Sequence, residues 1–156
     1  MSEVKKMTEF QMRIAKLLMT PFSRFQARRY LGSGGTRMVQ LAGRDICVVT
    51  MKGARTGKTR HIPLMHVPYL DGEGVVLVAS LGGAPKHPTW YYNLVANPDI
   101  EVQVLQRSLS LRARLASAEE KASVWPTCCE HYPDYQVYQD RSTRDIPVFL
   151  CEPRSR

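Results

Sequence analysis

The sequence predicts a small, mainly antiparallel β-barrel with helices packed on its outside. Several segments after residue 45 are rich in β-branched residues, and residues 100–106 and 109–115 alternate apolar and polar side chains, as half-buried antiparallel strands do. Helical patterns are few and short, and the strand–helix–strand rhythm of a doubly wound sheet is missing. We therefore expect one barrel domain over residues 41–156, preceded by a helical segment over residues 1–40.

The N-terminal segment combines an apolar stripe with many cations. Apolar residues recur at helical spacing over residues 7–18, Pro21 is expected to begin a second short helical piece, and residues 31–37 (LGSGGTR) are predicted to be a flexible joint. Against Glu3 and Glu9 stand seven basic residues: Lys5, Lys6, Arg13, Lys16, Arg24, Arg28 and Arg29. Two interpretations stay open, a helix packed on the core with a solvated basic face and a basic amphipathic helix resting on an anionic membrane.

The remaining elements follow from local patterns. Strands are expected at residues 45–51, 61–69, 74–80, 100–106, 109–115 and 146–152, with the second interrupted by Pro63 and Pro68. Residues 71–74 (DGEG) form a turn, and a short helix begins at Pro88 and ends before Pro98. Ser117 and Glu120 are spaced as a capping box, so a helix is expected near 118–130.

Composition narrows the partners. The formal charge of +8 and the pI near 9.6 favour an anionic partner. The basic residues occupy two separate regions without a nucleic-acid-reading motif, so no nucleic acid is expected. No apolar run approaches the length of a membrane span, and residues 1–10 lack the apolar core of a secretory signal. We expect a cytoplasmic monomer, in contact with the membrane surface at most, with reduced cysteines and no metal.

The stretch MKGARTGKTR, residues 51–60, is nearly a phosphate-binding P-loop. The pattern requires glycine at position 52, where the chain has Lys52, and the prolines that follow forbid the helix that a P-loop needs. The stretch instead resembles the tip of a β-hairpin with Gly57 at the turn. Lys52, Arg55, Lys58 and Arg60 crowd this tip. A merely solvated basic turn remains possible, but we favour an anion site because guanidinium groups bind phosphate and carboxylate bidentately.

Two further stretches predict the rest of a site. Residues 78–93 run from a buried strand through Gly82 and Gly83 into a helix start, a junction whose backbone N–H groups bind anions. Tyr132, Tyr135 and Tyr138 are three residues apart, which places them along one side of a helix. They are either packing residues of an amphipathic helix or an aromatic wall over a pocket.

Taken together, these stretches resemble the deazaflavin-dependent nitroreductases, also called F420H2-dependent quinone reductases, of mycobacteria and related actinobacteria. The resembling segments are residues 53–64, 78–98, 125–139 and 144–153, together with the alternating strand at 100–104. The resemblance implies a split β-barrel like that of flavin-binding pyridoxamine-phosphate oxidases. It also implies binding of coenzyme F420, a deazaflavin whose phospholactyl and polyglutamate tail is polyanionic.

The resemblance also implies roles for particular residues. Four residues of the basic turn would hold the tail and Pro63 would line the same groove: Arg55, Thr56, Lys58, Arg60 and Pro63. Residues along the ring and at the helix start would complete the cofactor site: Val78, Ala79, Ser80, Leu81, Gly82, Trp90, Tyr91, Asn93 and Tyr135. Ser80, Tyr135 and Tyr138 are the catalytic candidates, and Tyr132, Tyr135 and Tyr138 would border the substrate.

The implied activity is hydride transfer from the reduced deazaflavin to an electron-poor acceptor: a quinone such as a menaquinone, an activated enone or a nitroaromatic. The chain departs from the best-known nitroreductase of the family at Leu81, where that protein has lysine, and at Ala54, where it has arginine. Two other hypotheses stay open: an FMN-binding oxidoreductase of the same fold, and a non-catalytic F420 carrier at the membrane.

Overall fold

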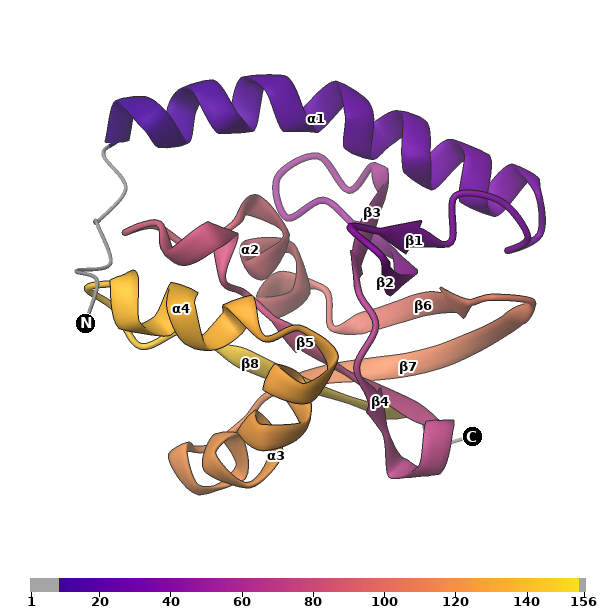
Figure 1. The fold of residues 1–156 in the computed structure, drawn as a ribbon. Coiled ribbons are helices and arrows are strands. Elements are labelled where there is room, and N and C mark those ends of the chain that lie inside the picture. The colour runs from indigo at the N-terminus through magenta and orange to yellow at the C-terminus, as the bar shows by residue number, and fades with distance from the viewer. Residues whose placement is uncertain (1–8, 155–156) are drawn as a thin grey trace.

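The computed structural model describes the backbone of residues 9–154 and side chains from residue 21 onward (Figure 1). The predicted apolar stripe over residues 7–18, and four of the basic residues (Lys5, Lys6, Arg13 and Lys16), therefore lie outside the described side chains.

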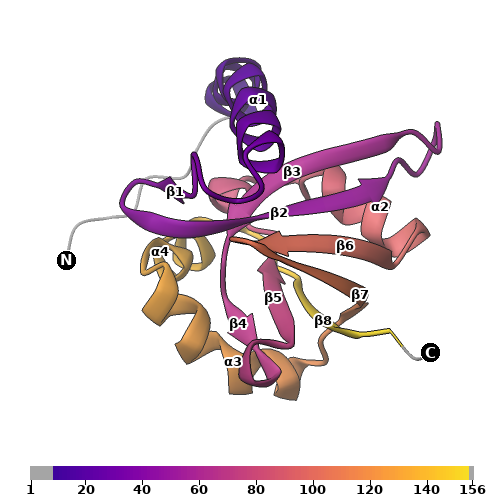
Figure 2. The same ribbon diagram turned by 90° about the vertical axis from the view of Figure 1, so that its right-hand side faces the viewer.

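The N-terminal segment is one long helix, α1 (Glu9–Gly32), with Pro21 inside it. The expectation that Pro21 begins a separate helical piece is wrong, because the helix continues through the proline. Figures 1 and 2 show α1 lying across β2 and β3. Ala27 and Tyr30 are buried against Ile46 and Val48 of β2. The helix is thus joined to the sheet by a small core of its own, while the division of the chain at residue 40 stays a prediction.

Polar contacts fix the end of α1 and the turn after it. The Tyr30 hydroxyl donates to the Ile46 carbonyl at 3.4 Å and accepts from the Leu105 N–H at 2.6 Å. The Gly35 N–H donates to the Tyr30 carbonyl, and a Cβ at Gly35 would lie 1.7 Å from the Leu105 carbonyl oxygen. Residues 33–37 are therefore a closely packed, hydrogen-bonded turn instead of the flexible joint that the sequence suggested.

Eight strands form one antiparallel sheet, which confirms the predicted fold class. Seven follow the order β1-β2-β6-β7-β8-β5-β4, and β3 pairs with β2 outside this path. Their bounds are β1 (Gln40–Leu41), β2 (Arg44–Lys52), β3 (Thr59–Met65), β4 (Pro68–Tyr69), β5 (Gly74–Val78), β6 (Asp99–Val104), β7 (Arg107–Leu115) and β8 (Val148–Pro153).

The sheet curls because its two edges belong to one stretch of chain. β3 pairs with β2 and β4 pairs with β5, yet only residues 66 and 67 separate β3 from β4. Pro63 does not interrupt its strand as expected: it lies within β3, opposite Val48. In the described sheet β3 pairs only with β2. There is thus no strand on its other side to which an N–H at residue 63 would donate, and a proline is tolerated there.

Helices cover the open sides of this half-barrel (Figure 2). They are the short turns η1 (Leu70–Gly72) and η2 (Leu81–Gly83) and the helices α2 (Thr89–Ala96), α3 (Ala118–His131) and α4 (Asp134–Arg141). Pro88 is the N-cap of α2, so the helix begins at Thr89, one residue later than predicted. The predicted capping box is confirmed, because the Ser117 side chain accepts from the Glu120 N–H and the Glu120 side chain accepts from the Ser117 N–H.

Alternate residues of the strands form two cores on opposite faces. Val75 and Leu77 of β5 point into the half-barrel with Phe149, and Trp90 and Leu94 of α2 close that core. Between them, residues Val76 and Val78 face α3 and α4 in the second core, with Cys128, Tyr135 and Ile146. The site elements thus lie around a strand, β5, that is buried on both faces.

No helix in the described part of the chain is long and apolar enough to cross a membrane. The four cysteines are free thiols, and three of them, Cys47, Cys128 and Cys151, are buried.

Candidate functional site

The basic turn is the tip of the β2–β3 hairpin, as predicted. Register pairs Lys52 with Thr59, and the Gly53 N–H donates to the Lys58 carbonyl at 2.8 Å. The Gly57 N–H donates to the Gly53 carbonyl, and Gly57 has φ +66°, which a residue with a side chain rarely adopts. The tip is therefore a defined turn.

Four cations are exposed on and beside this tip: Lys52, Arg55, Lys58 and Arg60. Within the described side chains, none of the four forms an ion pair. Thr56 lies among them and accepts from the Lys58 N–H at 3.2 Å. Like charges so close repel unless water or an anion screens them, so the tip is electrostatically suited to a multivalent anion.

Helix α2 anchors the tip. The Asn93 side-chain oxygen accepts from the Ala54 N–H at 2.9 Å, and the Asn97 side chain donates to the Lys52 carbonyl at 3.4 Å. Asn93 is only 9% exposed, so its amide is used inside the protein to position the turn. The structure thereby brings together two elements that lie about forty residues apart in the sequence.

The Gly-Gly loop after β5 is an unusual run of backbone. Leu81, Gly82 and Gly83 all have positive φ, at 44°, 64° and 81°. A Cβ at Gly83 would lie 2.7 Å from the Tyr138 carbonyl oxygen, so α4 approaches the loop at this residue as closely as a glycine permits. Ser80, which opens the loop, is 9% exposed. The predicted ring-lining loop and the tyrosine helix are therefore neighbours.

The three tyrosines gather in space, although they do not share a helix. Tyr132 is the C-cap of α3, whereas Tyr135 and Tyr138 belong to α4, so the prediction of one helix side is wrong. Their rings are nevertheless close, with centroids 4.9 Å apart for Tyr132 and Tyr135 and 6.5 Å apart for Tyr135 and Tyr138. The Tyr132 and Tyr138 hydroxyls are hydrogen-bonded at 2.9 Å.

Burial keeps Tyr132 and Tyr135 protonated by raising the pKa of each hydroxyl. Tyr135 is 5% exposed, and burial raises the pKa of its hydroxyl well above the ordinary value. Burial, followed by the hydrogen bond with Tyr138, raises the pKa of Tyr132 as well. Both phenols are therefore hydrogen-bond donors throughout the neutral pH range.

Several other predicted site residues are buried in the protein core or half-buried beside it. Val78 faces the core under α3 and α4, and Ala79 lies in the core of the half-barrel with no exposed surface. Trp90 is 6% exposed and contacts Phe149, so its ring packs in the core. Tyr91 is half-buried beside it. Pro63 lies half-buried in β3, on the strand that leaves the basic tip.

Sequence reasoning missed Arg144 and His87. Arg144 precedes β8 and contacts the Gly-Gly loop, and His87 lies between that loop and α2. A signal was available for Arg144, since a cation two residues before the buried run at 146–151 needs several hydrogen-bond acceptors. No comparable signal marks His87.

An open depression of about 290 Å³ lies away from these residues. Its lining comes from the β1–β2 turn, residue 66 and the end of α3: Gln40, Gly43, Arg44, Asp45, His66, Glu130 and His131. Burial, followed by His131, lowers the pKa of His66. None of the predicted site residues lines this depression. Across the described residues, no group of three His, Cys, Asp or Glu side chains is placed to hold a metal ion.

The curled antiparallel sheet is that of a split-barrel protein, and its exposed cationic hairpin tip is electrostatically suited to an anion. Residues 22–153 match the F420H(2)-dependent quinone reductase family, and the chain belongs to that family. The F420H(2)-dependent quinone reductase Rv1261c of Mycobacterium tuberculosis is 35% identical over 105 residues, which are 65% of this chain and 69% of that protein. The Rv3178 protein of the same organism is 35% identical over 103 residues, 66% of this chain and 85% of the relative.

Solved structures of similar sequence also include an F420-dependent reductase. A structure described as an F420-H2 dependent reductase (FDR-A) is 42% identical, with a TM-score of 0.64 and coverage of 69% of this chain and 93% of that one. A domain-swapped dimer is 41% identical, with a TM-score of 0.67 and coverage of 86% and 99%. The heme storage protein HutZ of Vibrio cholerae, 12% identical with a TM-score of 0.52 and coverage of 83% and 92%, shares the fold alone.

These findings confirm the predicted family, the mainly β split-barrel class, the oxidoreductase class and reduced coenzyme F420 as the cofactor of the family. The neighbour described as a domain-swapped dimer counts against our expectation of a monomer.

Proposed function

We propose that the protein transfers a hydride from reduced coenzyme F420 to an electron-poor, rather apolar acceptor: a quinone, an activated enone or a nitroaromatic. The observation that supports this best is the hairpin tip, where four exposed cations lie on a turn held by Asn93. A tip with this much charge suits a tail that carries a phosphate and several carboxylates better than it suits one phosphate group. This favours F420 over FMN.

The cofactor, when bound, supplies the hydride, and the chain's own residues bind and orient it. We assign the tail to the tip residues Arg55, Thr56, Lys58 and Arg60, with Pro63 beside them. We assign the ring to the loop after β5 and to the start of α2, through Val78, Ala79, Ser80, Leu81, Gly82, Trp90, Tyr91, Asn93 and Tyr135. Because Trp90, Asn93 and Ala79 are largely buried, their part is to shape and position the site more than to contact the ligand.

The acceptor side is assigned to Ser80 and the tyrosine cluster. Tyr135 and Tyr138 carry hydroxyls that can donate a hydrogen bond to the acceptor, and Tyr132 orients Tyr138 through the bond between their hydroxyls. Negative charge develops on the acceptor oxygen as hydride arrives, so a donor placed there stabilises the transition state. The apolar rings around it exclude water, which suits a lipophilic acceptor.

The experiment is a cofactor titration followed by turnover. Dissociation constants for F420 and FMN are measured on the purified protein, and oxidation of reduced F420 is then followed with menadione, an enone and a nitroaromatic. We expect tight F420 binding and turnover of at least the quinone. Tighter binding of FMN than of F420 would make FMN the cofactor. Binding of F420 without turnover of any acceptor would favour a carrier protein.

We further propose that α1 contacts an anionic membrane surface. Phe22 and Phe25 are 43% and 49% exposed, and they share the outer face of the helix with exposed Arg24, Arg28 and Arg29. Apolar rings flanked by cations favour the interface of anionic lipids. Such contact would bring the protein close to a membrane quinone.

The test compares the full chain with a Phe22→Ser/Phe25→Ser variant on vesicles with and without phosphatidylserine. Both substitutions lie on the exposed face, so the core around Tyr30 is left intact. We expect binding to anionic vesicles alone, and weaker binding by the variant. Full-length protein that ignores anionic vesicles at moderate salt would show that this face is ordinary surface.

A further inference from the structure

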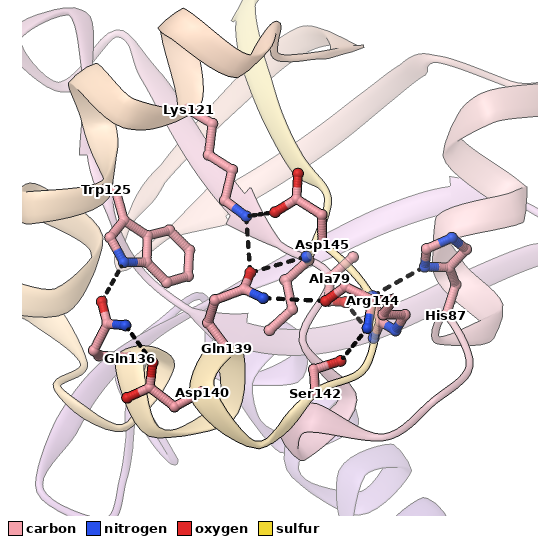
Figure 3. A network of polar contacts seen from close by, with 11 residues as sticks. Ala79, His87, Lys121, Trp125, Gln136, Gln139, Asp140, Ser142, Arg144 and Asp145 are labelled. Atoms are coloured by element: carbon pink, nitrogen blue, oxygen red, sulfur yellow. Dashed lines mark hydrogen bonds and ion pairs between the residues drawn. The ribbon is translucent and has the colours of Figure 1, made fainter.

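Arg144 joins the segment between α4 and β8 to the Gly-Gly loop. Its guanidinium donates to the Ala79 and Ser80 carbonyls, both at 3.0 Å, and to the Ala84 carbonyl at 3.0 Å. These acceptors lie on both sides of η2 in the sequence, and Figure 3 shows Arg144 beside Ala79 and His87. Leu81 has φ 44°, a conformation that a residue with a side chain favours weakly, and Arg144 helps to hold the loop in it.

Arg144 is itself firmly positioned. The Gln139 side chain donates to the Arg144 carbonyl at 3.1 Å and accepts from the Ile146 N–H and from Lys121 Nζ. Lys121 of α3 also pairs with Asp145. Figure 3 shows these contacts as one network that ends on the loop. The backbone at Arg144 is therefore held from two helices, α3 and α4, while its guanidinium is held by the loop carbonyls.

The fourth partner of the Arg144 guanidinium is His87. Arg144 Nη1 lies 3.0 Å from His87 Nδ1, and because a guanidinium only donates, Nδ1 must be the unprotonated nitrogen. The proton of the neutral ring is then on Nε2. The ring also stacks on Tyr91, with centroids 4.2 Å apart and planes inclined by 27°. Burial, followed by the charge of Arg144, lowers the pKa of His87, which keeps the ring neutral.

The Nε2–H group of His87 is available as a hydrogen-bond donor. Within the described residues no hydrogen bond involves Nε2, and Arg144 has no acidic partner. The groups facing the ring are Arg144 from the α4–β8 segment and Tyr91 and Tyr92 from α2. A fixed N–H beside an unneutralised cation is well suited to an electron-rich oxygen.

We propose that His87, held by Arg144 as the Nε2–H tautomer, donates a hydrogen bond to an oxygen of the bound deazaflavin, and that Arg144 is the positioning residue for His87 and for the Gly-Gly loop. The assignment of the ligand rests on the proposed function. It adds a ligand contact at a residue that no sequence motif marked, on the loop already assigned to the ring.

Two substitutions at residue 87 separate the donor from the ring. His87→Phe keeps an aromatic ring for Tyr91 and removes the donor, whereas His87→Gln keeps an amide N–H near the position of Nε2. We expect His87→Phe to raise the dissociation constant of F420 roughly five- to tenfold, the usual effect of one hydrogen bond, and His87→Gln to restore most of that loss. Equal, wild-type affinities in both variants would overturn the proposal.

A deazaflavin without the phosphate and glutamate tail distinguishes the two possible sources of the oxygen. If the loss in His87→Phe persists with this ligand, the contact is to the ring system. If the loss appears only with full-length F420, the contact is to the tail. Both results support a donor at His87, and the absence of any loss with either ligand would contradict it.

The role of Arg144 has a readout that needs no ligand. Nitrogen NMR of the protein without cofactor should show His87 as the neutral Nε2–H tautomer, and Arg144→Ala should move its pKa up toward the ordinary histidine value. Arg144→Ala should also release the Nε2–H tautomer, because the contact to Nδ1 is lost. An unchanged tautomer and an unchanged pKa of His87 in Arg144→Ala would overturn this part. If wild-type protein binds no F420 at all, the proposed function and the ligand of His87 fall together, whereas the tautomer result stands on its own.

Discussion

Removal of the Asn93 amide tests how the two halves of the site are joined. Asn93→Ala deletes the acceptor of the Ala54 N–H, a bond of 2.9 Å at a side chain that is 9% exposed. A buried donor left without a partner costs about 1–3 kcal/mol of the free energy of unfolding. The backbone at residue 54 would also be freed, and ordering one residue again on binding costs about 1–2 kcal/mol.

The predicted loss of affinity follows from that second figure. A cost of about 1–2 kcal/mol corresponds to a five- to thirtyfold weaker dissociation constant for F420. Stability is measured by urea unfolding and affinity by titration of the same samples. Asn97→Ala is the matched control, since its bond to the Lys52 carbonyl is longer, at 3.4 Å, and more exposed. The control should lose less of both quantities.

A double-mutant cycle with Arg60→Ala then identifies how Asn93 acts. If Asn93 only positions the tip, removing a tip cation first leaves less for Asn93 to contribute, and the double variant should lose less than the sum of the single losses. If Asn93 contacts the cofactor independently of the tip, the losses add. Wild-type affinity in Asn93→Ala would refute the idea that α2 sets the tip for binding.

Two further predictions concern the tip and the Gly-Gly loop. Arg55→Ala and Arg60→Ala should each weaken F420 binding by about 1.5–3 kcal/mol, and by less at high salt. Arg112→Ala, which removes an exposed cation paired with Asp99, is the control and should leave binding unchanged. Unchanged affinity in both tip variants would mean that the tip is only a solvated turn. Gly83→Ala should destabilise the fold by more than the about 1–2 kcal/mol of a positive φ alone, since its Cβ would lie 2.7 Å from the Tyr138 carbonyl oxygen. Gly82→Ala is the control for unfolding, because a Cβ there meets nothing within 4 Å; equal losses would contradict the close packing of α4.

Two features that depend only on neighbouring residues, the hairpin tip and the start of α3, were predicted from the sequence. The hairpin tip followed from Gly57 among cations, and the start of α3 followed from the spacing of Ser117 and Glu120, because each signal lies within a few residues of the structure that it specifies. The helix break expected at Pro21 did not occur. Proline removes one helical hydrogen bond, and the packing of Tyr30 and Ala27 on the sheet holds the rest of α1 in place.

The parts that sequence missed depend on distant residues. Arg144 contacts carbonyls of residues 79, 80 and 84, about sixty positions earlier, and nothing near Arg144 in the sequence reveals them. The site role of Trp90 stays a prediction, and the structure places this residue in the core, on the inward face of α2 with Leu94, four residues on. Helical spacing identified that face, but it could not tell whether core or ligand covers it.

The tyrosine cluster gives the sharpest separation of catalysis from binding. Tyr135→Phe removes a hydroxyl for which no hydrogen bond is found within the described residues, and it keeps a ring that packs against Tyr132 and Trp125. If this hydroxyl donates to the oxyanion that forms on the acceptor, its loss should lower the rate constant for acceptor reduction on the order of a hundredfold while F420 affinity stays unchanged. Tyr138→Phe instead removes the partner of the Tyr132 hydroxyl, so it should change the relative rates with two unlike acceptors. Both variants keep the aromatic packing, which makes loss of fold a poor explanation for either effect. Wild-type kinetics in both would return the cluster to the role of a packed helix pair, because a donor used only in the transition state cannot be removed without lowering the rate.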